Sequence, residues 1–157
     1  MLFLLFRIGA DRYALEANQV VEVVPLVHVK KLPRAPAGIA GVINYRGLPV
    51  PVIDLNELAL GQPVQARVST RIILVKYPME SGEEHTLGLM AEHATETLKR
   101  AASDFVSPGI AVSAAPYLGR VATDARGMIQ WIEVKNLLPG SVRESIFASP
   151  EEMPPCP

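Results

Sequence analysis

The chain has a single cysteine, and this scarcity excludes any structure that depends on disulfides within the chain. Cys156 lies in a proline-rich segment, so no intrachain disulfide can form and nothing indicates an oxidising compartment. We therefore expect a cytosolic protein. Histidine is also sparse: His28, His85 and His93 stand alone, with no cysteine or second histidine at ligand spacing. The sequence predicts neither a metal site nor a cofactor.

Neither sign of charge is in excess, and no long run of like charge occurs. The chain carries 15 Lys plus Arg against 16 Asp plus Glu, which gives no electrostatic footprint for nucleic acid or for an anionic membrane surface. The opening apolar run ends at Arg7, far short of a spanning helix, and no basic stretch precedes it. We interpret it as a buried first strand, and we expect neither a nucleic-acid partner nor membrane insertion.

Patterns that carry catalysis are missing as well. The sequence has no Gly-x-Ser-x-Gly elbow, no Walker pattern and no Gly-x-Gly-x-x-Gly loop. Two carboxylate pairs have structural explanations, since Asp54 with Glu57 fits a helix cap and Glu83 with Glu84 lies in a polar loop. The sequence therefore predicts a protein that is not an enzyme.

Apolar residues are abundant, and their clearest pattern occurs twice. In residues 39–55, Gly41 and Gly47 bracket an apolar strand and a tight turn, and an apolar run then ends at Asp54. A weaker copy over residues 119–137 follows about 80 positions later. Two copies are too few for a stacked array and favour two like subdomains packed together. With 49% apolar residues among 157, both can share one core.

Short strands at near-regular spacing predict an all-β fold made of two small β-barrels. The expected strands cover residues 2–8, 12–15, 20–24, 26–29, 50–53, 71–77, 86–90, 119–122 and 128–132. Pro25 places the third of these near a sheet edge. A rigid proline-rich connector is expected over 32–38, a short helix from Asp54 to Gly61, and a helical turn over 134–138.

Three segments are harder to assign. Residues 92–102 fit either a helix or a strand, and residues 107–116 are expected to be a loop with room for a short strand at 110–112. We place the end of the ordered domain at residue 140, and we expect the proline-rich residues 141–157 to be a mobile tail.

The order of six short motifs resembles the CheW-like domain of bacterial chemosensory systems, from about residue 3 to residue 138. These motifs are Phe6 with Tyr13-Ala14-Leu15, Val20-Val21-Glu22-Val23, Leu32-Pro33 with Ala35-Pro36, Gly41 to Gly47, Val50 to Leu55 and Thr70 to Val75. The resemblance implies two five-stranded SH3-like β-barrels around a common hydrophobic interface. With no receiver-like segment after residue 140, it implies one CheW-like domain rather than the two-domain CheV-like arrangement.

The resemblance also implies a function. Members of that family are non-catalytic couplers that bind the regulatory domain of a CheA-type histidine kinase and the cytoplasmic tip of chemoreceptors. The tip is a helical hairpin, and it would dock in an apolar groove between the barrels. Val20, Val23, Val24 and Ile43 are the groove candidates, and burial in the core is an equal alternative for each.

Polar residues of the same motifs complete the predicted partner-binding face. Glu22 lies among the valines, and Arg46 matches the arginine of the family's Asn-x-Arg-Gly turn, in which Gly47 supplies a positive φ. Arg46 has two roles open to it, direct contact with a partner or hydrogen bonds that hold the turn.

The second half departs from the family pattern. Residues 88–94 read Gly-Leu-Met-Ala-Glu-His-Ala where Gly-x-x-Val-Asp-x-Val is usual, and Glu133 replaces a common Asp. An altered pairing there would suit a coupler in a dedicated pathway whose output is motility, surface behaviour or second-messenger synthesis. A different class of function also stays open, a β-barrel that binds an apolar small molecule in the groove between the barrels.

Overall fold

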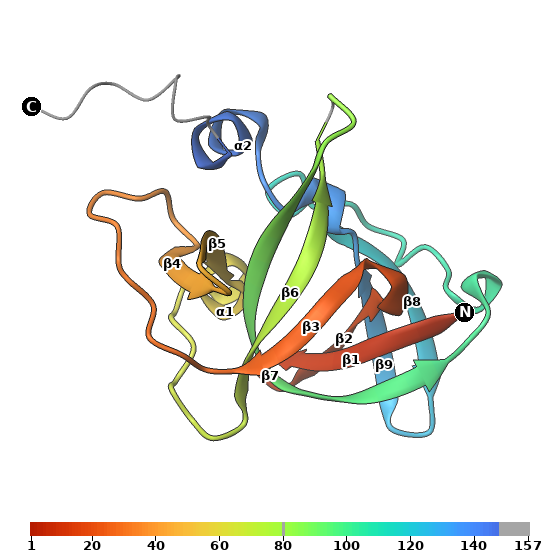
Figure 1. Cartoon of the computed structure of the whole chain (residues 1–157). Helices are drawn as coiled ribbons and strands as arrows, with labels where there is room; N and C mark the ends of the chain where they lie inside the picture. Colours follow the sequence, from red (N-terminus) through yellow and green to blue (C-terminus); the bar gives the residue numbers. More distant parts are fainter. Residues whose placement is uncertain (80, 148–157) are drawn as a thin grey trace, which may run out of the picture.

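The computed structural model describes residues 1–79 and 81–147, and this part of the chain is built mainly from β-strands (Figure 1). The strands are β1 (Leu2–Ile8), β2 (Asp11–Glu16), β3 (Val20–Pro25), β4 (Ile39–Tyr45), β5 (Leu48–Asp54), β6 (Thr70–Pro78), β7 (Glu84–Lys99), β8 (Leu118–Asp124) and β9 (Gly127–Ile132). Two helices are α1 (Leu55–Leu60) and α2 (Gly140–Ile146), and 3₁₀ turns cover Ala17–Gln19, Ala102–Asp104 and Val134–Asn136.

The first barrel is formed by β3, β6, the first part of β7, β5 and β4. Neighbouring strands pair in that order, with β5 parallel to β7 and the other pairs antiparallel. The barrel closes where the segment after β3 meets β4: Lys30 N–H donates to Val42 O at 2.8 Å, and Val42 N–H donates to Lys30 O at 2.9 Å.

The second barrel repeats this arrangement with the last part of β7, then β1, β2, β9 and β8. Here β9 is parallel to β2, and the other pairs are antiparallel. Closure again comes from the segment that follows the edge strand, because Val106 bridges Val121 of β8. The predicted all-β fold of two five-stranded barrels is confirmed.

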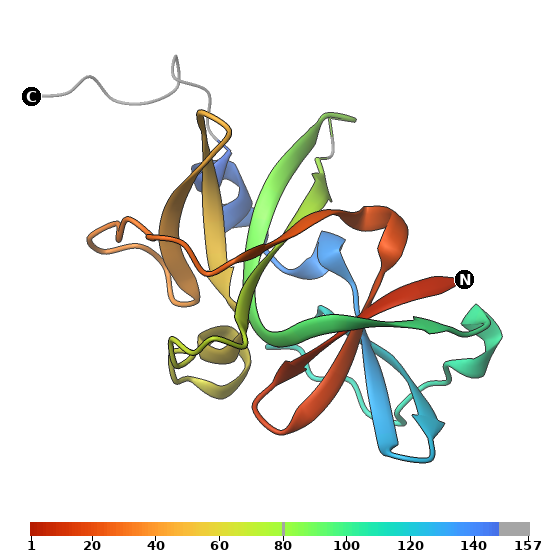
Figure 2. The same cartoon turned by 60° about the horizontal axis from the view of Figure 1, so that its bottom comes forward.

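Strand β7 belongs to both barrels and passes from one to the other (Figure 2). Its residues up to Glu92 pair with β6, and its residues from Glu92 onward pair with β1. The bend falls at His93, which has a φ of 55°. This assigns the ambiguous residues 92–99 to a strand.

The internal duplication is visible in equivalent hydrogen bonds. Asp54 N–H donates to Gly38 O at the end of the β4–β5 hairpin, and Glu133 N–H donates to Tyr117 O at the end of the β8–β9 hairpin, each at 2.8 Å. Extended to the two halves of the chain, the copies comprise β1–β5 and β6–β9, and they are interleaved in space. Each barrel takes its opening hairpin, β1–β2 or β6–β7, from one copy and its other strands from the other copy.

Apolar side chains form three clusters that follow this architecture. One fills the first barrel around Val52, and one fills the second barrel around Phe3. The largest lies between the barrels, where side chains of β1 and β2 meet side chains of β5, β6 and β7. The barrels therefore share a common hydrophobic interface, which fixes one relative to the other.

Local sequence signals explain the hairpins and the first helix. Asp54 caps α1 by accepting hydrogen bonds from the N–H groups of Asn56 and Glu57, and Gly61 ends the helix with a φ of 77°. The hairpin at residues 2–16, the edge position of β3 and the loop around residue 110 are also as predicted.

One expected strand is wrong. Residues 26–29 form no strand, because Pro25 ends β3 and only Lys30 makes a bridge. Of the alternatives for residues 107–116, the structure has the loop without a strand at 110–112. Beyond residue 140, α2 continues to Ile146, and Phe147 contacts Tyr77 and stacks on His85. The rest of the expected tail, residues 148–157, lies outside the described residues.

Candidate partner-binding surface

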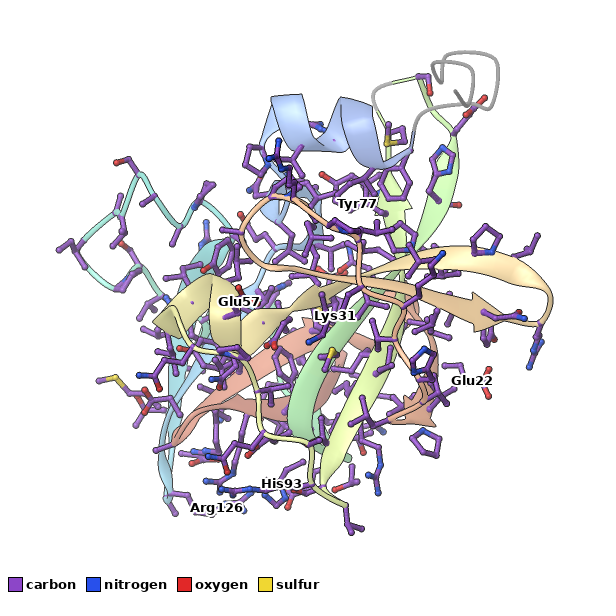
Figure 3. All side chains as sticks on the ribbon, turned by 90° about the vertical axis from the view of Figure 1, so that its left-hand side faces the viewer. Glu22, Lys31, Glu57, Tyr77, His93 and Arg126 are labelled. Carbon is purple, nitrogen blue, oxygen red and sulfur yellow. The ribbon has the colours of Figure 1, made fainter. Side chains whose placement is uncertain are left out.

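The predicted polar residues Glu22 and Arg46 meet at the exposed edge of the first barrel. β3 is the last strand of the sheet, and Glu22 projects from it toward the end of β4 (Figure 3). The Glu22 carboxylate accepts a hydrogen bond from the Tyr45 hydroxyl at 2.5 Å and another from Arg46 Nη2 at 3.3 Å. The Arg46 guanidinium also lies 5.1 Å from the centre of the Tyr45 ring, a cation–π distance.

The Tyr45 hydroxyl acts as a donor in this cluster. Its hydrogen bond to Glu22 raises the pKa of Tyr45, and partial burial adds to that effect. A raised pKa keeps the phenol protonated at physiological pH, so it goes on donating to Glu22. The carboxylate is therefore held by two donors from the β4–β5 hairpin.

Arg46 is presented outward by its turn. Arg46 and Gly47 have φ values of 52° and 85°, the pattern of a two-residue hairpin turn that twists with its strands. Gly47 N–H donates to the Asn44 side-chain oxygen at 2.8 Å, which fixes the turn without Arg46. The Arg46 side chain is 75% exposed. Its hydrogen bond goes to Glu22 on another strand, so it tethers the turn to β3 and still offers its guanidinium to a partner.

The four apolar candidates do not share one surface. Val20 and Val23 are partly buried against the cluster between the barrels, and Val24 is partly buried against the first barrel's interior. Ile43 is only 3% exposed and belongs to that interior. Ile43 is therefore a core residue, the second of its two predicted roles. The three valines are accessible only in part.

An apolar depression lies beside Ile43 on the first barrel. It has a volume of about 440 Å³ and is lined by Val27, His28, Lys30, Val42, Ile43 and Asn44. Asn44 connects it along β4 to the Tyr45–Arg46 end of the hairpin. The depression therefore lies on the same hairpin as Tyr45 and Arg46, although neither of them lines it. It is on one barrel, not between the two.

Sequence reasoning missed an exposed apolar loop on the second barrel. Ile110 is 72% exposed in the loop between β7 and β8, and Val106 and Val112 are exposed on the same loop. The signal was present, because residues 105–119 contain no charged side chain. Exposed apolar side chains gathered on one segment typically mark an interaction site.

Other polar features of the described residues have structural explanations. Arg12 binds Asp124 through two hydrogen bonds, of 2.9 and 2.5 Å, and joins the β1–β2 hairpin to the β8–β9 hairpin. Among residues 1–79 and 81–147, no cluster of three or more His, Cys, Asp or Glu side chains could hold a metal ion. The same residues include no helix long and apolar enough to span a membrane.

Comparison with known proteins gives a consistent result. The family model described as the CheW-like domain matches residues 2–141. The chain is 26% identical over 138 residues to the chemotaxis protein CheW of Klebsiella aerogenes, covering 87% of this chain and 80% of that protein. It is 26% identical over 142 residues to the chemotaxis protein CheW of Rhizobium meliloti, covering 89% and 88%.

A solved structure shares the fold. The crystal structure of the scaffolding protein TtCheW from Thermoanaerobacter tengcongensis superposes with a TM-score of 0.76 at 26% sequence identity. The match covers 88% of this chain and 87% of that one. The similarity therefore spans both barrels, including the second, where the sequence departs most from the family pattern.

Proposed function

Because this chain belongs to the CheW-like domain family, we propose that it is a non-catalytic coupling protein of a chemosensory pathway. It joins the cytoplasmic tips of chemoreceptors to the regulatory domain of a CheA-type histidine kinase, at receptor arrays on the inner face of the membrane. The pathway has its own receptor, and its output is motility, surface behaviour or second-messenger synthesis.

The observation that carries this proposal is the Glu22–Tyr45–Arg46 cluster. Side chains from β3, β4 and the β4–β5 turn contact one another at the exposed edge of the first barrel, and they leave an arginine pointing outward. An arginine held in one place loses little freedom on binding, and arginine and tyrosine are enriched among the residues that dominate interface energies. The apolar depression beside the cluster adds the surface that such an interface needs at its centre.

In this proposal one surface binds the receptor, another binds the kinase, and a third adds an apolar contact. The receptor helices dock over β3, where Val20, Val23 and Val24 are partly accessible, in the helix-in-groove mode. The kinase contacts the β4 side of the first barrel through Arg46 and the depression. The exposed loop around Ile110 provides a further apolar contact on the second barrel. Because the barrels share one core, all three surfaces are held in a fixed relation.

The alternative of a small-molecule barrel gains no support from the interior of either barrel. Side chains fill both: Ile43, Val50, Val52, Ile72 and Leu74 in the first, and Phe3, Leu5, Phe105, Ala122 and Ile129 in the second. An apolar ligand would have to bind in a surface depression. A protein partner fits such a surface better, since small-molecule sites bury most of their ligand.

The test is a calorimetric titration of the protein with the CheA-type kinase encoded nearest to it. We expect saturable binding, and we expect Arg46→Ala to weaken it about tenfold, the order of loss for an arginine at the centre of an interface. Lys99→Ala, an exposed cation on the second barrel, is the matched control and should bind as the wild type does. Circular dichroism should show every variant folded.

A second variant separates the two roles of Arg46. Glu22→Gln removes the ion pair but leaves the guanidinium free to reach a partner. If Arg46 contacts the kinase, Glu22→Gln keeps most of the affinity. If Arg46 acts only by tethering the turn to β3, both variants lose the same affinity. Wild-type protein that is folded but binds no kinase from the same cell would refute the proposed function.

A further inference from the structure

The distribution of charge along the chain is uneven, although the net charge is only −1. Between Glu22 and Asp54 there is no acidic residue, and this stretch carries Lys30, Lys31, Arg34 and Arg46. Three of these cations lie within the segment of residues 26–38 that joins β3 to β4, which we call the basic connector. His28 lies on the same segment.

The cations of the basic connector are exposed, and none of them forms an ion pair with an acidic residue of the described ranges 1–79 and 81–147. Lys30, Lys31 and Arg34 all lie at the surface. Within the part of the chain that the structure describes, the ion pairs join other cations, namely Arg12, Arg46, His85, Arg100 and Arg126. Glu57 of α1 is on the face that Figure 3 presents with Lys31, but it is in none of the ion pairs of the described residues. A segment with several cations and no acidic residue attracts a partner of the opposite charge.

The backbone of the connector is anchored on β4 at Lys30, and its prolines restrict the residues that follow. Its backbone pairs with β4 through the two hydrogen bonds between Lys30 and Val42. Gly41 makes this approach possible, because a β-carbon at that position would lie 2.0 Å from Lys30 O. Pro33 and Pro36 restrict the backbone of the remaining residues. A partner therefore meets a surface that is ordered before it binds.

One cation of the basic connector, Lys30, borders the apolar depression directly, and Lys31 and Arg34 follow it along the same segment. Lys30 and His28 line it together with Val27, Val42 and Ile43. A surface with an apolar centre and a rim of one charge sign fits a partner segment with apolar side chains flanked by acidic ones.

We propose that the basic connector and the apolar depression form the docking surface for an acidic segment of the kinase regulatory domain. This inference rests on the proposed function and adds the charge of the partner. The kinase is the occupant because the receptor helices are assigned to β3, whereas the residues lining the depression all lie on the connector and on β4. Exposed charges at the edge of an interface act mainly on the association rate and on its salt dependence. The connector therefore selects the cognate kinase by electrostatic complementarity.

The test compares two double charge reversals of equal net change. Lys31→Glu with Arg34→Glu changes the connector without altering the backbone contacts of Lys30. Lys76→Glu with Lys99→Glu changes two exposed cations on β6 and β7 that form no ion pair with the described acidic residues. Binding of each protein to the full-length kinase is measured by surface plasmon resonance from 50 to 500 mM NaCl.

We expect the connector variant to bind about tenfold more weakly at 50 mM NaCl, since two favourable pairs become repulsive contacts. The loss should fall mainly on the association rate, and it should shrink as salt rises. The control variant should follow the wild type at every salt concentration. Circular dichroism and thermal melting confirm that both variants fold.

Three results would overturn the inference. Equal binding of the connector variant and the wild type refutes it and leaves the proposed function standing. A loss confined to binding of a receptor fragment refutes the assignment to the kinase. Absence of any wild-type binding to the kinase refutes the proposed function, and this inference fails with it.

Discussion

At the scale of single residues, the ion pair of Arg12 with Asp124 is expected to make the stability of the fold depend on pH. The Arg12 side chain is only 8% exposed, and it also donates to Gly127 O. Its hydrogen bonds hold the pKa of Asp124 far below the usual range, helped by the Arg126 N–H. The same pair raises the pKa of Arg12. Both groups stay charged in the folded state across the physiological range.

This pair predicts a loss of stability in acid. The folded state keeps Asp124 ionised at a pH where the unfolded chain binds a proton, so stabilisation is complete above the unfolded carboxyl pKa of about 3.9 and declines below it. Asp124→Asn should melt at a lower temperature than the wild type at pH 7, because it leaves Arg12 without its counter-charge. The difference in melting temperature between this variant and the wild type should narrow as the pH falls from 4 to 2. Thermal melts at a series of pH values measure this difference.

Asp11→Asn changes an exposed carboxylate next to Arg12 on the β1–β2 hairpin. It is the control, and its melting temperature at pH 7 should differ less from that of the wild type. A gap between Asp124→Asn and the wild type that stays constant down to pH 2 would contradict the electrostatic explanation. It would indicate that the amide disturbs packing instead.

At the scale of elements, β7 shows how one residue allows a strand to serve two barrels. His93 has the left-handed φ of 55°, which costs a residue with a β-carbon about 1–2 kcal/mol. Its N–H donates to Ser69 O at 3.0 Å, and its side chain is exposed. The strain therefore lies in the backbone at the bend.

His93→Gly should leave the free energy of unfolding unchanged or raise it, because relief of the strain offsets the greater freedom of glycine in the unfolded chain. His93→Val should lower it by about 1–2 kcal/mol, since a β-branched residue fits this conformation worst. Urea denaturation measures both. Thr95, exposed two residues further along the same strand, is the control: Thr95→Gly should destabilise and Thr95→Val should not. If the glycine and valine variants ranked in the same order of stability at both positions, the role of the bend would be contradicted.

The bend also shows why part of the fold could not be predicted. Hairpins and caps depend on local signals such as the Arg46–Gly47 turn or Asp54 and Gly61, and these were read correctly. Residues 92–99 depend on pairing with β1, which is distant in sequence, so composition alone fitted helix and strand equally. The proline-rich sequence that follows residue 147 favours a tail from residue 141 onward, so the sequence does not predict α2. Its apolar side chains Val142, Ile146 and Phe147 pack on the cluster between the barrels.

The sequence likewise predicts single residues of the candidate surface but not the contacts between them. Glu22 and Arg46 were both selected from their motifs, but their contact through Tyr45 joins two strands and needed the structure. A barrel that packs on a second barrel buries apolar residues on both faces of its strands. Strand alternation therefore could not decide whether Ile43 faces a groove or the core. The basic connector could have been recognised from the sequence, because no acidic residue occurs between Glu22 and Asp54.

At the scale of the whole molecule, the interleaving of the two copies makes the barrels interdependent. The first copy supplies β3, β4 and β5 to the first barrel and β1 and β2 to the second. Neither half of the chain contains a complete barrel. A coupling protein benefits from this construction, because its two barrels cannot unfold or move apart independently without breaking strand pairs in both.

The interleaving predicts the behaviour of fragments. We expect residues 1–67 and residues 68–157 each to be unfolded alone, since each lacks the partners of its own strands, and to form the native fold when mixed in equal amounts. The cut precedes Val68, which is 92% exposed, so it disturbs little packing. Far-UV circular dichroism reports both barrels. Trp131, the single tryptophan, reports the second barrel through its contacts with Phe3 and Phe105.

In the intact chain the same two probes should follow one transition in urea, because the shared cluster couples the barrels. Each fragment at twice the concentration is the control, and it should show no cooperative transition. A fragment that unfolds cooperatively on its own would mean that its strands form a barrel without their partners. Separate transitions for the two probes in the intact chain would mean that the barrels are stable independently. In that case the fixed relation between the surfaces proposed for the kinase and for the receptor would have to come from the bound partners and not from this protein itself.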